Sequence, residues 1–211
     1  MRTARLVAQA QERLRAIEHG TSSYTDDEPL IIRGARPTQS AAALFEPDPI
    51  HYLARTKKPH VLLKTDGSEP EVIVPSVRPP STQYAAGLGS LADWTLTTSV
   101  RQFLAMTAIR TTSDYAITAN DIVGVDWRSA MTSTPGNAEG IRVPSLVMVM
   151  TCNDHIVLGE IIFDHLASKD KTFAGVEGAV HEFWPCKPEY GDTEKRLFDF
   201  VDRWLAKPGR F

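Results

Sequence analysis

The sequence predicts an α/β fold built around a mostly parallel sheet. The apolar run Leu146–Val149 is continuous rather than alternating, which is typical of a strand buried on both faces by helices. Strand and helix patterns alternate in the last third of the chain, at Leu146–Thr151, Gly159–Ala167, Thr172–Val176 and Asp192–Leu205. Because a helix between two strands allows them to run parallel, this alternation favours a parallel sheet covered by helices.

The chain begins with the pattern of an amphipathic helix, predicted over Arg2–His19. Its apolar residues recur at helical spacing, at Leu6, Ala10, Leu14 and Ile17. Gly20 follows as a helix stop signal. Periodicity is weak over Thr21–Pro59, where we expect a brief strand at Leu30–Ile32 and a helical turn at Ala41–Phe45.

Two short strands are predicted next. His60–Lys64 is a largely apolar stretch that ends in the turn signal Thr65–Ser68. Glu71–Val77 is a second extended segment. Pro75 places it at the edge of a sheet, because proline cannot donate a hydrogen bond to a neighbouring strand.

A longer helix is expected at Leu91–Thr111, and the segment Asp121–Asn137 is expected to be rich in loops. The helix is predicted from an apolar stripe formed by Trp94, Leu96, Val100, Phe103, Leu104 and Ala108. The last helix, Asp192–Leu205, can be capped by Asp192 or Thr193. Its buried face is predicted at Leu197, Phe200, Val201 and Trp204.

Length and composition exclude several classes of protein. The chain has 211 residues, of which 42% are hydrophobic and 23% charged, and this suits one globular domain. A net charge of −3 provides no basic field for nucleic acid. No apolar run approaches the roughly 20 residues of a membrane span. Charged residues lie among the apolar residues of the N-terminal helix, so it lacks the continuous apolar run of a signal peptide. We therefore expect no signal peptide and a cytoplasmic protein.

We expect no cofactor, no metal ion and no disulfide. Cys152 and Cys186 are widely spaced and form no C-x-x-C pair, which predicts two free thiols rather than a disulfide framework or a zinc site. The histidines lack metal-ligand spacing, and no Gly-rich loop could cradle a phosphate. Glu160, His155 and His165 are expected to be surface or loop residues.

The residues that point most clearly to chemistry are Asp154 and His181. Asp154 follows the strand Leu146–Thr151, and His181 lies 27 residues further along, after Thr172–Val176. Loops after adjacent parallel strands can meet across a strand spacing of about 5 Å. A serine hydrolase needs a histidine base that an acid orients. We therefore predict a catalytic pair, with His181 as base and Asp154 as its orienter. The alternative is structural, with Asp154 forming a turn and His181 exposed in a loop.

The segments around this pair resemble the α/β-hydrolase family. Val143–Asp154 resembles the seventh strand of the family, with a V-P-x-L lead-in and an acid just after the strand. Thr172–Phe183 resembles the eighth strand, and its G-A-V-H-E-F ending matches the Gly-x-x-His pattern of the family. Asp192–Leu205 resembles the closing helix. The resemblance covers Ile141–Lys207, under a third of the chain.

The resemblance implies a division of the chain. Residues 1–67 and 141–211 would form part of the hydrolase core, an incomplete sheet, and residues 68–140 would be a helical cap inserted after the sixth strand. In some members the acid follows that sixth strand, which makes Asp66 the runner-up acid.

The cap would also contribute to substrate binding. Under the resemblance, the helix expected at Leu91–Thr111 would line a substrate pocket with Trp94, Phe103 and Met106. The alternative is that these three residues are core contacts of the same helix.

The chain contains no convincing nucleophile. The family places its serine in G-x-S-x-G, on a strand-to-helix elbow, and this motif is absent. Serines in partly similar settings are Ser22, Ser23, Ser68 and Ser90. A thiol nucleophile made by Cys186 and His181 is a further alternative. In the family the nucleophile precedes the sixth strand, so the chain resembles the C-terminal half of a hydrolase, beginning downstream of that residue.

Two functional hypotheses follow. The first is a hydrolase that cleaves an ester, amide or similar bond in a small molecule, with a serine that is not in this chain. The second is a catalytically inactive hydrolase fragment or interaction module. A sheet without its first strands would expose an apolar edge. We therefore expect a second copy of the chain or a missing N-terminal half as a partner.

Overall fold

The computed structural model describes residues 2–33, 54–78, 95–153 and 155–210. Contacts divide the chain into two compact units. The N-terminal unit comprises Met1–Pro49, Ser81–Ala116 and Ile122–Asn137. The C-terminal unit comprises Ile50–Pro80, Ile117–Asp121 and Ala138–Phe211. This grouping joins the first 49 residues to segments from the middle of the chain, whereas the division expected from the sequence joins them to the C-terminal strands.

The C-terminal unit is built around a four-stranded sheet in the order β3-β2-β8-β7. Its strands are β2 (Arg55–Leu63), β3 (Glu71–Pro75), β7 (Ser145–Met150) and β8 (Lys171–Val176). Strand β8 pairs in parallel with both β2 and β7, and β3 pairs antiparallel with β2 at one edge. The fold class is therefore α/β with a mostly parallel sheet, as the sequence predicts.

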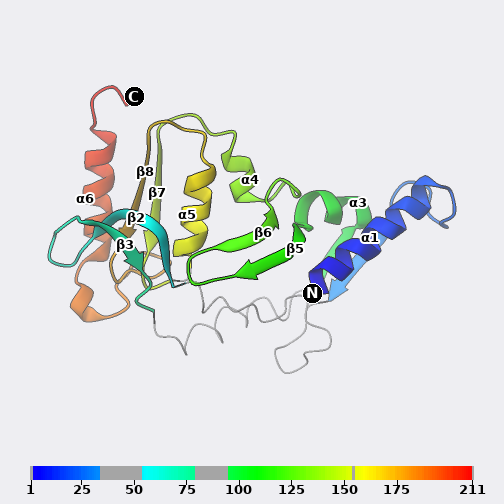
Figure 1. Ribbon diagram of the computed structural model, residues 1–211, viewed down its shortest axis with the longest axis horizontal. Helices are drawn as coiled ribbons and strands as arrows, with labels where there is room; N and C mark the ends of the chain where they lie inside the picture. Colours follow the sequence, from blue (N-terminus) through cyan, green and yellow to red (C-terminus); the bar gives the residue numbers. More distant parts are fainter. Residues whose placement is uncertain (1, 34–53, 79–94, 154, 211) are drawn as a thin grey trace. The chain divides into compact units, whose positions relative to one another are not determined.

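Two helices, α5 (Ile156–His165) and α6 (Thr193–Leu205), lie on opposite sides of this sheet (Figure 1). On the α5 side, the buried core is formed by Leu62, Val74, Val149, Ile156 and Phe173. On the α6 side, it is formed by Leu63, Met150, Val176, Ala179 and Leu197. Because neighbouring residues of a strand point to opposite faces, the continuous apolar runs of β7 and β8 supply both cores.

Helix α6 is fastened to the sheet at its first turns. The side chain of Asp192 caps the helix by accepting a hydrogen bond from the backbone N–H of Lys195 at 2.8 Å. Further along, the guanidinium of Arg196 donates to three backbone carbonyls, those of Leu63, Glu177 and Tyr190. These contacts hold α6 against the carboxyl ends of β2 and β8.

The N-terminal unit contains α1 (Arg2–Glu18), which matches the predicted helix closely. Strand β1 (Pro29–Arg33) confirms the brief strand expected there and pairs antiparallel with β4 (Thr95–Ser99). Strands β5 (Arg110–Ile117) and β6 (Ile122–Asp126) form a second two-stranded sheet. A short helix, α4 (Thr134–Ala138), follows them. The helical turn expected at Ala41–Phe45 lies outside the described residues.

The helix predicted over Leu91–Thr111 is correct for residues 100–107 and wrong on either side of them within the described residues. Residues 95–99 form β4. The short helix α3 (Val100–Gln102) and the π-helix η3 (Phe103–Thr107) then lie between β4 and β5. The segment is rich in threonine, whose branched β-carbon favours strands over helices. The apolar stripe is therefore shared between a strand and two helical turns rather than lying along one helix.

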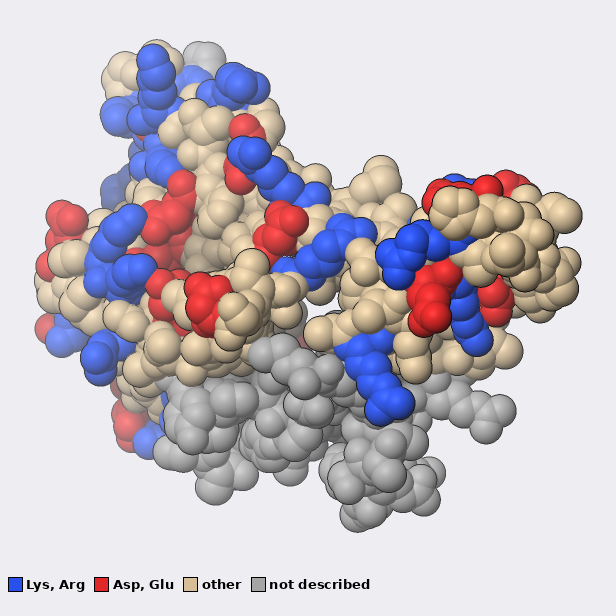
Figure 2. Space-filling view, turned by 45° about the vertical axis from the view of Figure 1, so that its right-hand side comes forward, with Lys and Arg blue, Asp and Glu red and all other residues tan. Residues whose placement is uncertain are grey.

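The described surface carries charges of both signs. On the face shown in Figure 2, Lys and Arg lie among Asp and Glu over both units. Within the described residues, no helix is long and apolar enough to cross a membrane.

We expect Ile156→Ala to destabilise the C-terminal unit by about 2–5 kcal/mol, because Ile156 is 1% exposed and its removal would leave a cavity between α5 and the sheet. Ile73→Ala is the matched control, since Ile73 on edge strand β3 is 39% exposed and should cost under about 1 kcal/mol. Urea unfolding of both variants measures the difference. Equal losses of stability would contradict this assignment of the core.

Candidate functional site

The loops after β7 and β8 leave the sheet at the same end, beyond the carboxyl ends of the two strands. The two strands pair in parallel without a register shift, from Ser145 opposite Lys171 to Met150 opposite Val176. Both strands therefore end at the same level, and the loops that follow them start side by side. His181 lies in the loop after β8. Asp154, its predicted partner, lies outside the described residues.

His181 lies at the tip of a small hairpin formed by Gly178–Cys186. The backbone N–H of Val180 donates to the carbonyl of Trp184, and the N–H of Cys186 donates to that of Gly178, each at 2.8 Å. A turn closes the hairpin, with the N–H of Phe183 donating to the carbonyl of Val180 at 2.8 Å. The imidazole at this tip is exposed to solvent.

Two backbone features fix the shape of this hairpin. Gly178 has a φ of +73°, and a β-carbon there would lie 1.9 Å from the ring of Tyr190, so a larger residue would displace that ring. Phe183 has a φ of 66°, which is uncommon for a residue other than glycine. The hydroxyl of Thr193 donates to the carbonyl of Phe183 and holds this conformation.

A disulfide joins the two loops. Cys152, just after β7, is bonded to Cys186 at the base of the hairpin, with 6.4 Å between their α-carbons. The expectation of two free thiols is therefore wrong. The cysteines are 34 residues apart in sequence, but the parallel pairing of β7 and β8 brings them together. Because Cys186 is oxidised, the alternative of a thiol nucleophile beside His181 is also excluded in this form of the protein.

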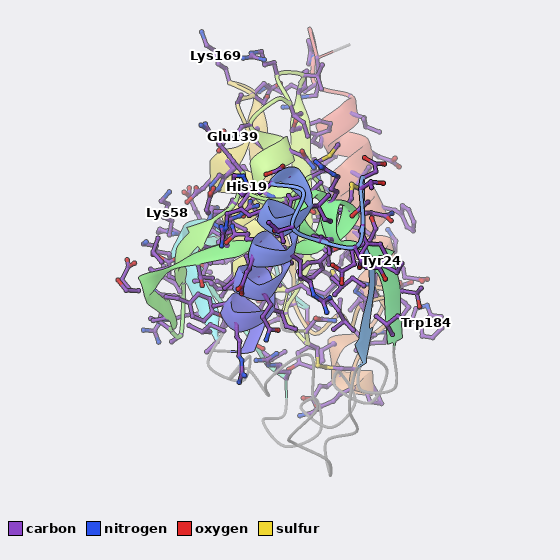
Figure 3. All side chains as sticks on the ribbon, turned by 90° about the vertical axis from the view of Figure 1, so that its right-hand side faces the viewer. His19, Tyr24, Lys58, Glu139, Lys169 and Trp184 are labelled. Carbon is purple, nitrogen blue, oxygen red and sulfur yellow. A yellow bond between two sulfur atoms is a disulfide. The ribbon has the colours of Figure 1, made fainter. Side chains whose placement is uncertain are left out.

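The site is open to solvent and carries aromatic side chains. The rings of His155 and His181 lie 5.4 Å apart, so the loop after β7 reaches the tip of the hairpin. Trp184, on the same hairpin, is 59% exposed (labelled in Figure 3). The cavities of about 490 Å³ at the end of α6 and about 210 Å³ beside α1 do not include His181. An exposed imidazole can take up a proton from a group that approaches from outside.

The runner-up acid, Asp66, is engaged within its own turn after β2. Its carboxylate accepts hydrogen bonds from the backbone N–H of Ser68 at 2.9 Å and from the Ser68 hydroxyl at 2.6 Å. These bonds lower the pKa of Asp66, whose small loss of hydration acts in the opposite direction. The Ser68 hydroxyl, one of the weak nucleophile candidates, therefore donates to a carboxylate rather than to a histidine.

The residues proposed for a substrate pocket are found in different settings. Phe103 is buried in the core of the N-terminal unit, with Val7, Ala10, Ile32, Val100, Leu104 and Ala108. This is the structural alternative that the sequence left open. Met106 is partly buried, and its backbone carbonyl accepts a hydrogen bond from Thr132. Trp94 and Ser90 lie outside the described residues.

A buried polar pair, His60 and Glu160, was missed by the sequence analysis. Glu160 on α5 is 2% exposed, so its expected place on the surface is wrong. Its carboxylate accepts hydrogen bonds from the backbone N–H groups of Lys57 and Lys58 and lies 2.9 Å from Nε2 of His60. The ring of His60 packs against those of Phe163 and Phe173, which also contact each other. The sequence signal for the burial of Glu160 was a single acid within the apolar stretch I-V-L-G-E-I-I-F.

This pair supports the irregular start of β2, where the pairing with β3 shifts between Arg55 and Pro59. The shift frees backbone N–H groups that a neighbouring strand would otherwise bind, and Glu160 accepts from two of them. Burial opposes the ionised form of Glu160, but the hydrogen bonds from His60, Lys57 and Lys58 outweigh it, so the pKa of Glu160 is lowered. Its role is therefore structural.

The geometry thus defines an α/β protein with an exposed histidine hairpin cross-linked to the end of the neighbouring strand. Comparisons with protein-family models, with curated proteins and with solved structures find no match to this chain.

We expect the disulfide to stabilise the folded protein by about 3–4 kcal/mol, because it closes a loop of 34 residues in the unfolded chain. Cys152→Ser/Cys186→Ser should show that loss in urea unfolding, and dithiothreitol should destabilise the wild type while leaving the double variant unchanged. Titration of the unfolded, unreduced wild type should find no reactive thiol. Two reactive thiols would contradict the cross-link.

We expect Glu160→Gln to cost about 1–3 kcal/mol at pH 7, since the amide nitrogen cannot accept the hydrogen bonds that one carboxylate oxygen accepts. Because the folded pKa of Glu160 is lowered, its contribution is present above the ordinary glutamate pKa of about 4.3 and is lost as the pH falls through the folded pKa. The difference in the free energy of unfolding between wild type and variant should therefore decrease in acid.

Urea unfolding at several pH values measures this gap. Glu189→Gln is the control, because the Glu189 side chain is 66% exposed. A gap of constant size from pH 7 into the acid range would show that the ionised carboxylate is not what stabilises the fold.

Proposed function

We propose that the loops after β7 and β8 carry the acid and histidine of an α/β-hydrolase-type active site. In this proposal His181 is the general base and Asp154 orients it. The substrate is a small molecule with an ester, amide or similar bond, and the serine nucleophile is not within these 211 residues. The observation that carries the proposal is the in-register parallel pairing of β7 and β8, which starts both loops at one sheet edge.

Two further contacts support this arrangement. The disulfide between Cys152 and Cys186 restrains the hairpin against the end of β7. The ring of His155, the residue after Asp154, lies 5.4 Å from that of His181. A base that must take a proton from a serine needs a defined position and access to that serine, and a cross-linked hairpin with an exposed histidine at its tip supports both.

The chemistry would follow from these positions. The imidazole of His181 would take the proton of an approaching serine hydroxyl as its oxygen attacks the substrate carbonyl, and would later donate a proton to the leaving group. The carboxylate of Asp154 would accept a hydrogen bond from the other ring nitrogen, which selects the required tautomer and stabilises the imidazolium. In this scheme β7 and β8 correspond to the seventh and eighth strands.

A second candidate is an interaction module without catalytic activity. Trp184, 59% exposed on the same hairpin as His181, favours it, because exposed tryptophan is enriched among residues that dominate protein interfaces. The sequence also has no G-x-S-x-G. In this case the hairpin would bind a partner protein, and the disulfide would keep it rigid for that purpose.

The acid–histidine pair can be tested without a nucleophile, by ¹⁵N NMR of the imidazole rings. We expect neutral His181 to carry its proton on Nδ1, the tautomer that a hydrogen bond to Asp154 selects, and Asp154→Ala to shift it towards the Nε2–H tautomer favoured in water. His19, exposed in the N-terminal unit, is the internal control and should not change. If His181 is unaffected by Asp154→Ala, the pair does not exist and the interaction module is favoured.

Activity of the chain by itself is a separate question. Incubation with p-nitrophenyl acetate and a fluorophosphonate probe should give no labelled serine, because the proposal places the nucleophile outside the chain. Labelling that disappears in His181→Ala but persists in His19→Ala would show that a serine within the chain acts with His181. That result would support the hydrolase and correct the position of its nucleophile.

A further inference from the structure

An open cavity of about 490 Å³ lies at the C-terminal end of α6, near the first residues of β8 and away from the His181 hairpin. It is lined by Thr172, Phe200, Arg203, Trp204, Ala206, Lys207, Pro208 and Arg210. The cavity is open to solvent rather than enclosed. Two aromatic rings and three cationic side chains in one cavity give it a definite chemical character.

One wall of the cavity is rigid. The indole Nε1 of Trp204 donates to the hydroxyl of Thr172 at 3.0 Å. The guanidinium of Arg210 lies 3.8 Å from the centre of the Trp204 ring and donates to both carboxylate oxygens of Asp170, at 2.7 and 3.0 Å. The side chain of Arg210 is only 3% exposed. The indole is therefore held in place before any ligand arrives, which lowers the entropic cost of binding.

The end of α6 does not oppose an anion strongly. The carbonyls at a helix C-terminus carry partial negative charge, which normally repels anions. Here the carbonyl of Trp204 accepts a hydrogen bond from Arg210 at 2.6 Å, and the N–H of Ala206 donates to the carbonyl of Asp202 at 2.9 Å. These two bonds satisfy carbonyls of the last turn.

The rim of the cavity is cationic. Asp170 compensates the charge of Arg210, and Glu69 forms an ion pair with Arg203. That second pair is exposed on both sides, with side-chain exposures of 57% for Arg203 and 41% for Glu69, so it is weak and Arg203 can turn towards a ligand at little cost. Lys207 is exposed beside them and adds a positive charge. Figure 2 shows Lys and Arg gathered at the upper end of the C-terminal unit.

We propose that this cavity binds a small aromatic anion, with its planar ring against Phe200 and Trp204 and its carboxylate or phosphate beside Arg203 and Lys207. The partly buried rings of Phe200 and Trp204 account for a flat apolar body, and the cationic rim accounts for the negative charge. The site is independent of the proposed hydrolase chemistry, since it involves neither His181 nor Asp154.

The binding of 8-anilino-1-naphthalenesulfonate, an aromatic anion whose fluorescence rises in apolar surroundings, tests the proposal on the folded chain. We expect saturable binding that Lys207→Gln and Arg203→Gln each weaken by up to about fivefold, as for exposed charge pairs, and that the double variant weakens further. Lys187→Gln is the control, because Lys187 is an exposed cation paired with Glu189 on another loop. It should bind the probe as the wild type does.

Competition distinguishes the parts of the ligand. We expect 1-naphthoate or 1-naphthyl phosphate to displace the probe more effectively than the uncharged 1-naphthylmethanol, and inorganic phosphate to displace it weakly. The stronger of the two naphthyl anions identifies the preferred anionic group. Unchanged affinity in the Lys207→Gln/Arg203→Gln variant, with circular dichroism showing native structure, would overturn the proposal. So would equal competition by 1-naphthylmethanol.

Discussion

Strand β8 receives hydrogen bonds from both sides, from β2 and from β7, and the C-terminal unit depends on this double pairing. Helices cover both faces of this sheet, as is usual where strands pair in parallel. Gly175 in β8 shows how close the packing is, since a β-carbon there would lie 2.9 Å from the side chain of Val74. The same pairing fixes the level at which the two loops beyond β7 and β8 begin.

Polar side chains satisfy backbone groups that packing of the apolar cores leaves without hydrogen bonds. Glu160 and Arg196 work in similar ways from opposite sides of the sheet, because each satisfies backbone groups that the strands leave free. The carboxylate of Glu160 accepts from backbone N–H groups at the irregular start of β2, and the guanidinium of Arg196 donates to carbonyls near the ends of β2 and β8. Glu160 is buried and Arg196 is half-buried, and hydrogen bonds to the backbone replace the hydration that each charge loses.

The hydrolase and the interaction module make different demands on the same hairpin. A catalytic base must meet a nucleophile and an acid, whereas a binding surface needs only a rigid, exposed shape. The disulfide and the positive φ of Phe183 provide rigidity for either role. The decisive difference is therefore whether the carboxylate of Asp154 orients His181, which is a property of one hydrogen bond and not of the fold.

Much of the C-terminal unit could be predicted from local sequence. The continuous apolar run before Met150, the turn signal after β2, Pro75 at the edge of the sheet and the cap at Asp192 each indicate a structure through forces that act within a few residues. The same local reasoning was only partly right at Leu91–Thr111, where residues 100–107 are helical but strands occupy residues 95–99 and begin again at Arg110. Apolar periodicity identifies what is buried, but it does not say which element buries it.

The placement of His181 after β8 followed from the sequence, because order along the chain determines which loop follows which strand. The disulfide and the burial of Glu160 did not, since each depends on groups distant in the chain. Cys152 and Cys186 meet because β7 and β8 are neighbours, and Glu160 is buried because α5 covers the start of β2. Local sequence thus determined most elements of the C-terminal unit and the loop that carries His181, while the order of strands in the sheet decided which polar groups came together.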